Sequence, residues 1–158
     1  MVRASCLFPI GWVVALLAIC ANSLGQTTVL SGFYINISNK KKCSNLITAF
    51  VGRDDYCVSE NPIIGVSEFE SISRIKIDPI TGEQSIVLKL SPVGNRAWEG
   101  VLKNLPDALL VLVVEGYVVG TFKNEGYRKS NVIPIYAPRE SSQLQWIYDH
   151  LKSVMVVE

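Results

Sequence analysis

Residues 109–122 read LLVLVVEGYVVGTF, in which six apolar residues precede a Glu115-Gly116 step and a second Val-rich run follows it. Six consecutive apolar residues are too few to cross a bilayer, because a spanning helix needs about 20. Two short runs rich in Leu and Val on either side of a Glu-Gly step instead predict two buried strands joined by a tight turn. The stretch therefore predicts a buried β-hairpin at the base of a small domain, with its turn facing outward. Residues 109–122 are called the floor hairpin below.

A second hairpin is predicted upstream of this floor. Ile75 and Ile77 alternate with charged residues in Ser73–Asp78, and apolar residues alternate again through Ser85–Leu90. The segment Pro79-Ile80-Thr81-Gly82 between the two runs supplies turn residues. Downstream, Asn131–Tyr136 reads as a further strand. Pro134 predicts an edge position or a bulge for that strand, because proline cannot donate to the ladder.

Two helices complete the pattern. Ser91-Pro92 is typical of a helix start, with Ser as N-cap and Pro in the first helical position, and Pro106 ends this helix. Its apolar residues recur at helical spacing: Val93, Ala97, Val101, Leu102 and Leu105, with Trp98 beside them. The second helix is predicted to open at Pro138, and its apolar stripe comprises Leu144, Ile147, Tyr148, Leu151, Val154 and Met155.

The element order from residue 63 onward is therefore β-β-α-β-β-β-α. Hairpins with helices dispersed between them predict an α+β fold, an antiparallel or mixed sheet with two helices on one face. An N-terminal strand precedes this unit, since Val29, Phe33, Ile35 and Ile37 alternate within residues 27–38. Between that strand and the unit, residues 43–62 are expected to form a disulfide loop.

The first 26 residues, MVRASCLFPIGWVVALLAICANSLGQ, have the order of a secretory signal peptide: one Arg, an apolar core, then small residues. Cleavage is expected after Ser23 or Gly25. The alternative is an uncleaved membrane anchor, because Leu7–Leu24 approaches the length of a spanning helix. The predicted organisation is a signal peptide over 1–25, a strand and disulfide loop over 26–62, and an α+β domain over 63–158.

The four cysteines divide into two pairs. Cys6 and Cys20 lie in the leader, and Cys43 and Cys57 remain in the exported chain. An oxidising export compartment favours a disulfide between Cys43 and Cys57. Two free thiols or half of a metal site are the alternatives. No second pair of ligands is present, because the only histidine is His150, so no metal is expected.

Composition and motifs argue against several classes of function. The chain has 15 Lys+Arg against 14 Asp+Glu, and this balance disfavours nucleic-acid binding, which relies on clustered cations. Asp149 and His150 are adjacent on a predicted helix, where neighbouring side chains diverge, so they do not predict a general base with its partner. The segment SPVGNRAWEG lacks a phosphate-loop Lys and the glycine spacing of a dinucleotide site. No catalytic residue and no cofactor are predicted.

The run ENPIIGVSEFESISRIKIDPITGEQSIVLKLSPVGNRAWEGVL, residues 60–102, is similar to the head subdomain of the first large periplasmic domain of SecD, an accessory subunit of the bacterial protein-export translocase. Asp78–Gly82 matches the hairpin turn of that family and Leu90–Gly94 matches its helix start. Val114–Val118 matches an Asp-Gly turn, with Glu115 in place of Asp. The resemblance covers about residues 60–155.

Two departures accompany the resemblance. Gly120-Thr121 stands where the family has Ala-Pro, and Pro134 replaces a glycine of the fifth strand. The resemblance implies a stand-alone head-like domain without the transmembrane helices and the base subdomain of SecD. It also implies a non-enzymatic domain that handles polypeptides rather than one that uses a proton gradient.

The sequence thus predicts an exported, periplasmic or secreted envelope protein that binds polypeptides or envelope proteins, in a role linked to protein export. Membrane contact is expected only through an uncleaved leader, which would make the protein N-terminally anchored. The candidate interaction residues lie in the floor hairpin turn and along an edge strand: Glu115, Gly116, Tyr117, Asn131, Ile133 and Ile135.

Two other functions stay open at this point. The first is a secreted structural or inhibitory interaction module. The second is a secreted hydrolase with an unrecognised site, which requires a deep pocket where polar side chains converge near Glu115, Arg128 or Asp149.

Overall fold

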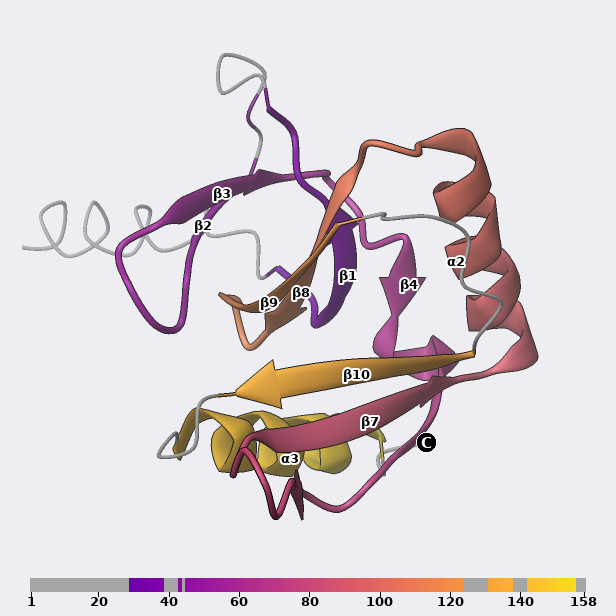
Figure 1. Ribbon diagram of the computed structural model, residues 1–158. Helices are drawn as coiled ribbons and strands as arrows, with labels where there is room; N and C mark the ends of the chain where they lie inside the picture. The colour runs from indigo at the N-terminus through magenta and orange to yellow at the C-terminus, as the bar shows by residue number, and fades with distance from the viewer. Residues whose placement is uncertain (1–28, 39–42, 44, 124–130, 138–141, 156–158) are drawn as a thin grey trace, which may run out of the picture.

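In the computed structural model, residues 29–38, 43, 45–123, 131–137 and 142–155 are described. They form ten β-strands, a short 3-10 helix and two α-helices (Figure 1). The central sheet has the strand order β4 (Ile64–Gly65), β1 (Gly32–Ile35), β8 (Leu109–Val114) and β9 (Tyr117–Lys123). The outer sheet has the order β10 (Val132–Ala137), β7 (Gln84–Leu90) and β5 (Phe69–Ile72), with β6 (Lys76–Ile77) also paired with β7. A separate hairpin pairs β2 (Asn45–Thr48) with β3 (Asp55–Val58).

The α+β class is confirmed, and the predicted elements follow in the predicted order as β6, β7, α2, β8, β9, β10 and α3. Strands β4 and β5, which lie between residue 63 and β6, were not predicted. The strands are divided between the central and outer sheets rather than joined in one. Every strand pairing between the described strands is antiparallel. The predicted segments 26–62 and 63–158 share the central sheet, because β1 from the first segment lies between β4 and β8 from the second.

The floor hairpin is confirmed as β8 and β9, but only β8 is a buried strand, because most of β9 beyond Val118 and Val119 is half-buried or exposed. All of β8 from Leu110 to Val114 is buried, because both faces of this strand are covered. The turn residues Glu115 and Gly116 have φ of 49° and 78°. Positive φ at both central residues is typical of the turn type whose twist matches the flanking strands, and it explains the glycine.

The large core joins the inner faces of both sheets to the two helices. Alternate β8 residues face it, and it holds aromatic residues in edge-to-face contact, among them Phe33 with Phe69, Trp98 and Phe122. Helix α3 packs against β5, β7, β10 and β8, and α2 packs against β4 and β7. Each sheet therefore supplies one face to a common interior.

The other face of the central sheet is covered by the β2–β3 hairpin. A second core forms there from Tyr34, Ile47, Val58, Val111, Val113 and Val118. The predicted N-terminal strand is confirmed as β1, and Phe33 and Tyr34 are both buried in it, because a layer on each side leaves the strand no solvent-facing side.

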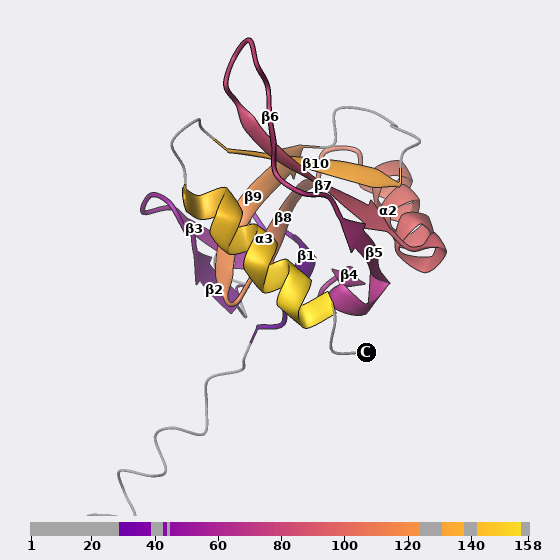
Figure 2. The same cartoon turned by 90° about the horizontal axis from the view of Figure 1, so that it is seen from below.

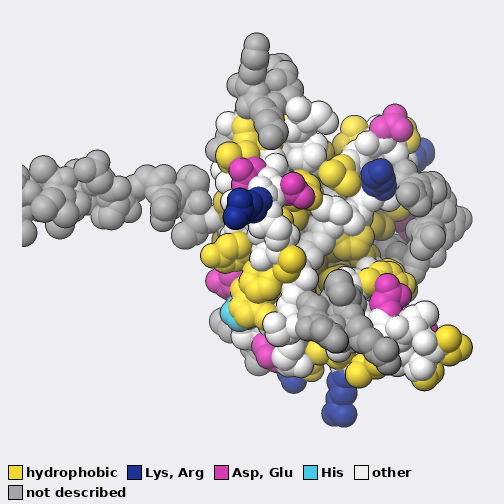
Figure 3. Space-filling view, turned by 60° about the vertical axis from the view of Figure 1, so that its left-hand side comes forward, with side chains coloured by type: hydrophobic (Ala, Val, Ile, Leu, Met, Phe, Trp, Pro, Cys, Tyr) yellow, Lys and Arg dark blue, Asp and Glu magenta, His cyan; other side chains and the backbone are white. Residues whose placement is uncertain are grey.

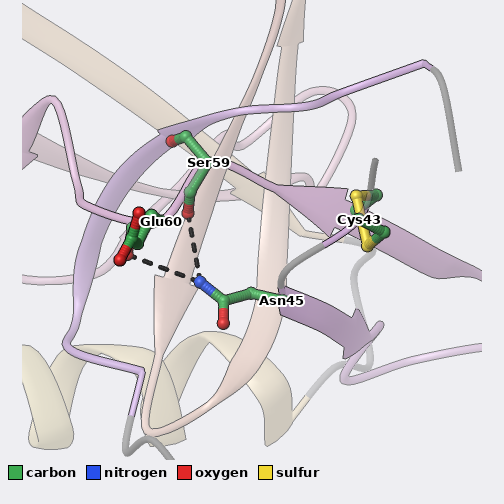
Figure 4. Close-up of a disulfide and its surroundings, with 5 residues drawn as sticks. Cys43, Asn45, Ser59 and Glu60 are labelled. Atoms are coloured by element: carbon green, nitrogen blue, oxygen red, sulfur yellow. Dashed lines mark hydrogen bonds between the residues drawn. A yellow bond between two sulfur atoms is a disulfide. The ribbon is translucent and has the colours of Figure 1, made fainter. Parts of the chain in front are cut away.

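The predicted disulfide is confirmed. Cys43 and Cys57 are bonded, with 5.5 Å between their Cα atoms. The segment expected as a loop folds as a hairpin, and the bond ties residue 43 to strand β3. Beside it, the Asn45 side-chain amide donates to the carbonyls of Ser59 and Glu60 at 3.3 Å and 3.4 Å (Figure 4). The disulfide and this side chain fix the hairpin at its open end.

The β6–β7 hairpin is confirmed, with a shorter first strand than predicted. Only Lys76–Ile77 pairs as β6, and β5 pairs with the other end of β7, with an irregularity between Phe69 and Ser71. Between these two segments, the Ser73 N–H donates to the Val87 carbonyl, and the Val87 N–H donates to the Ser73 hydroxyl. Figure 2 shows the hairpin projecting from the body, on the side opposite to the end of α3.

Helix α2 (Pro92–Asn104) begins as predicted, since the Ser91 side chain accepts a hydrogen bond from the Gly94 N–H at 3.2 Å. It ends before Pro106. Its buried face is Gly94, Trp98 and Leu102, whereas Val93 and Leu105 are exposed, so the predicted stripe is wrong at these two positions. The cause is Gly94, where an added Cβ would lie 2.8 Å from the Glu68 carbonyl oxygen. Close contact at this glycine sets which face turns inward.

Helix α3 (Ser142–Met155) buries Leu144, Ile147 and Leu151, and it half-buries the other three predicted stripe residues. The predicted start at Pro138 lies outside the described residues. The described helices include none that is long and apolar enough to cross a membrane.

Candidate functional site

The turn of the floor hairpin is exposed, as predicted. Glu115, Gly116 and Tyr117 all lie at the surface. The Glu115 N–H donates to the Ser31 hydroxyl at 3.1 Å, which ties the turn to the segment that leads into β1. The turn is thus accessible but held in place from one side.

The edge of β9, the strand that follows this turn, is covered where the strand begins. Ala49 pairs with Val118 in parallel, and the Phe50 N–H donates to the Val118 carbonyl at 2.9 Å. The chain after β2 therefore acts as a short extra strand against β9. A partner cannot pair with Val118 without displacing it.

An aromatic stack holds this extra segment in place. The Phe50 ring lies on the Trp146 ring with 4.4 Å between centroids, and Tyr117 meets both edge-on. The stack continues to His150, 4.2 Å from Trp146. His150 Nδ1 donates to the Trp146 carbonyl at 2.8 Å, since a carbonyl can only accept. Figure 3 shows hydrophobic side chains gathered beside the histidine on this face. Trp146 and His150 are thus packing residues that close the β9 edge.

The β10 edge differs, because β7 is the sole sheet neighbour of β10 among the described strands (Figure 1). The Asn131 carbonyl accepts from the Leu90 N–H at 2.8 Å. Hydrogen-bonding residues alternate along an antiparallel pair, so the backbone groups of Ile133 and Ile135 also face β7. Those of Pro134 and Tyr136 face away from it. Pro134 thus lies at an edge, as predicted, where its missing N–H costs the sheet no bond.

The contact residues proposed for this edge need a correction. Ile133 and Ile135 are only 3% and 2% exposed, because their side chains enter the large core. Asn131 is half-buried. The accessible side chains are those of the alternate positions Val132 and Tyr136, the latter 62% exposed. Strand periodicity shifts the candidate surface by one residue, from the odd to the even positions of β10.

Two hollows mark the surface of the described residues. A groove of about 620 Å³ runs between the start of β1, the β4 region, the floor hairpin turn and the end of α3. Its lining is mainly apolar, including Leu30, Phe69 and Met155, with Glu115 at the rim. A smaller polar hollow lies beside Arg53, Asp54 and Asp55. The groove does not gather the polar side chains that a hydrolytic site needs. The smaller hollow does gather polar side chains, but neither Glu115 nor Asp149, near which such a site was expected, belongs to its lining.

The remaining catalytic candidates are not brought together. Asp149 is exposed, and its carboxylate accepts from the Gln145 side-chain amide at 2.9 Å and 3.0 Å. Arg128 lies outside the described residues. Burial raises the pKa of Tyr34, whose hydroxyl donates to the Leu30 carbonyl at 2.7 Å, which makes it a structural tyrosine. Within the described ranges, no cluster of three His, Cys, Asp or Glu residues could hold a metal ion.

The fold and these surfaces define an α+β domain whose accessible chemistry lies in turns and along a strand edge. No protein-family model and no curated protein matches the sequence. The fold is SecD-like: it matches a structure of SecDF, a membrane component that enhances protein export, with a TM-score of 0.58 at 18% identity. That match covers 96% of this chain and 72% of the other.

A structure of SecDF in its super-membrane-facing form also matches, with a TM-score of 0.59 at 17% identity. It covers 88% of this chain and 20% of that chain, so this protein spans a small part of the SecDF in that structure. The resemblance expected from the turn and cap residues is therefore confirmed as a likeness of fold. It also extends beyond residues 60–155.

Proposed function

We propose that this chain is an exported, non-enzymatic envelope protein that binds extended polypeptide along the open edge of β10, in a role linked to protein export. The observation that carries the proposal is the contrast between β9, whose edge is covered at Val118, and the open edge of β10 in a SecD-like fold. In SecDF, the fold belongs to a membrane component that enhances protein export.

The edge binds by adding a strand. The outward backbone groups of Pro134 and Tyr136 offer two carbonyls and one N–H to an incoming chain. The exposed Tyr136 ring and the neighbouring Val132 supply apolar contact beside them. Such pairing depends on the backbone of the bound polypeptide and only weakly on its sequence. A protein that handles many polypeptides requires this low sequence dependence.

Pro134 limits the strength of this pairing. An edge without proline presents a full row of donors and acceptors, and it is prone to pair with other chains irreversibly. Pro134 removes one donor from the centre of β10. Binding at this edge is therefore weak and reversible, which suits transient contact with a passing polypeptide.

The organisation predicted from the sequence fits this role. Residues 1–25 direct export and are removed, and the remaining chain works in the periplasm or outside the cell. The disulfide between Cys43 and Cys57 is consistent with an oxidising compartment. The SecD-like region over 63–158 carries the binding edge.

The test uses pairs of apolar ten-residue peptides labelled with a fluorophore, with backbone N-methyl groups at alternate residues in one of two registers. A strand that pairs through one edge tolerates N-methyl groups on its far side only. Fluorescence anisotropy with the chain from Gln26 onward is expected to show that one register binds at least about tenfold more tightly than the other. Equal affinity of the two registers contradicts edge pairing.

A matched pair of variants locates the site. Tyr136→Lys together with Val132→Lys is expected to weaken peptide binding several-fold. Thr121→Lys on the exposed face of β9 serves as the control and leaves the affinity unchanged. Loss of affinity in both variants would place the peptide elsewhere or indicate a general effect of added charge.

A further inference from the structure

The tip of the β6–β7 hairpin carries the most exposed of the large hydrophobic side chains in the described residues. Ile80 is 92% exposed and Ile77 beside it is 63% exposed. Single apolar residues scattered on a surface are normal. These two lie together with Pro79 on a narrow element that projects from the body (Figure 2).

The tip is also rigid. The Asp78 N–H donates to the Glu83 carbonyl at 2.9 Å, and the Gly82 N–H donates to the Asp78 carbonyl at 2.8 Å. The Asp78 carboxylate accepts from the N–H groups of Ile80 and Thr81 at 2.8 Å and 2.9 Å. Gly82 takes φ of 68°, which closes the turn. Because the turn is ordered in the free protein, presenting Ile80 to a partner costs little conformational entropy.

We infer that this tip is a docking knob, in which Ile80, supported by Ile77, enters an apolar pocket of another folded protein whose rim carries a Lys or Arg. The inference is independent of the proposed function, because the hairpin tip and the β10 edge are different surfaces.

The charges around Ile80 select the kind of partner. The backbone N–H groups of Thr81 and Ile80 hold the pKa of the Asp78 carboxyl below its usual value, so the carboxylate is ionised. Glu83 adds a second acid at the tip, and Lys76 at its base is the nearest cation along the hairpin. Carboxylates are costly to bring into hydrocarbon, so two acids beside Ile80 favour a protein surface over a lipid bilayer. A protein pocket with a cation at its rim satisfies both the apolar and the acidic side chains.

The position of the hairpin supports a docking role. Val29, where the described chain begins, and Met155, where the last helix ends, both line the groove at one side of the molecule. Figure 2 places the hairpin tip on the opposite side. If the chain is held by another molecule near Val29 or Met155, Ile80 therefore points away from that molecule.

The experiment introduces a photo-crosslinking amino acid at position 80 of the full chain in its native cells, and at position 93 as a control. Val93 is also exposed, at 54%, but lies on α2 away from the tip. The expected result is a discrete adduct with one protein from position 80 and none from position 93. An adduct with lipid alone, equal adducts from both positions, or no adduct from position 80 overturns the inference.

The captured protein is then purified and its affinity for the full chain is measured. Ile80→Ser is expected to weaken binding by about tenfold or more, as expected for a central apolar anchor, whereas Val93→Ser leaves it unchanged. Asp78→Asn keeps the turn, because Asn can accept the same two bonds, and is expected to weaken binding severalfold and to reduce its dependence on salt. An affinity unaffected by Ile80→Ser overturns the inference.

The same variant separates the two proposals. Ile80→Ser is expected to bind the preferred N-methylated peptide as wild type does. Its melting temperature is expected to stay unchanged, because the side chain is almost fully exposed. Failure of the peptide assay therefore leaves the docking knob standing, and failure of the docking assay leaves the β10 edge standing.

Discussion

The β9 and β10 strands both end a sheet, but the edge of β9 is covered where the strand begins, whereas that of β10 is not. Phe50 and Ala49 pair with Val118 of β9, and the Phe50 ring is stacked on Trp146. On β10, the outward backbone groups of Pro134 and Tyr136 have no neighbouring described strand. The comparison teaches that this molecule protects its edges in two ways: one edge is covered by a distant segment, and the other keeps its access but loses a donor to proline.

The strongest test of the closed edge removes the disulfide. Replacing Cys43 and Cys57 together with alanine is expected to cost about 3 kcal/mol of unfolding free energy, as expected for a loop of this length. Because the hairpin carries Phe50, the variant is also expected to expose the β9 edge and to self-associate. Denaturant unfolding and sedimentation measure the two effects.

Reductant provides the control for this variant. Added to wild type, it is expected to lower stability by a similar amount, and added to the variant it is expected to do nothing. A variant as stable as wild type would show that the hairpin is held by its second core alone.

The second prediction tests the contact of Phe50 with the start of β9. Phe50→Ala removes a half-buried ring from the stack with Trp146 and is expected to cost about 2 kcal/mol, less than a fully buried Phe. The Phe50 amide, which donates to Val118, is expected to exchange its hydrogen faster. Val51→Ala, at a more exposed neighbouring position, is the control and is expected to change neither quantity.

If hydrogen exchange at residue 50 is unchanged in Phe50→Ala, the backbone bond to Val118 closes the edge without help from the stack. Trp146→Ala then distinguishes the contributions of the two rings, because it removes the other half of the stacked pair.

The third prediction concerns Tyr34, on the covered face of the central sheet. Burial raises its pKa in the folded protein, so the folded state resists ionisation above the pKa of the unfolded tyrosine, near 10. The unfolded state then binds fewer protons than the folded state, and stability falls as pH rises through this range. Tyr34→Phe is expected to remove this alkaline loss.

At neutral pH, Tyr34→Phe is expected to cost about 1 kcal/mol, because it removes the hydrogen bond to the Leu30 carbonyl. Tyr136→Phe, at an exposed site, is the matched control. Denaturant unfolding at neutral pH and above pH 10 checks both parts, and a Tyr34→Phe variant with the same alkaline loss as wild type contradicts the assignment.

The smallest effect on stability is expected at the open edge. Pro134→Val restores an outward N–H and is expected to change unfolding free energy by less than about 0.5 kcal/mol, since position 134 makes no backbone bond to β7. Peptide affinity and self-association are expected to rise. Equilibrium sedimentation and the N-methyl peptide assay measure these changes, and unchanged values in both contradict an open edge at this position.

Much of the local structure was predictable from short stretches. Residues 109–122 predict the floor hairpin because the first strand is uniformly apolar, the second begins with a Val-rich run, and the turn has a glycine at a position with positive φ. Ser91-Pro92 predicts the start of α2 because capping and the missing proline N–H act within one turn. The disulfide was predictable because only Cys43 and Cys57 lie outside the predicted leader.

Other features depend on long-range contacts, and the sequence did not reveal them. The burial of Tyr34 requires the β2–β3 hairpin to cover the sheet from outside. The inward face of α2 depends on the approach of Gly94 to Glu68. For the candidate site, the strand at 131–136 was predicted correctly, but its accessible residues were assigned one position out of register. An apolar Ile in an edge strand can serve a partner or a core, and only the neighbouring layer decides between them.

The sequence by itself determined where the floor hairpin, the β6–β7 hairpin and the start of α2 lie, because periodicity, capping and turn chemistry act over a few residues. It also favoured a bond between Cys43 and Cys57, and it limited residue 134 to an edge position or a bulge, since proline cannot donate to the ladder. Only the tertiary structure decided which edge is closed. That outcome depends on Phe50, Val118 and Trp146, which come from three separate elements and meet only when the whole chain has packed.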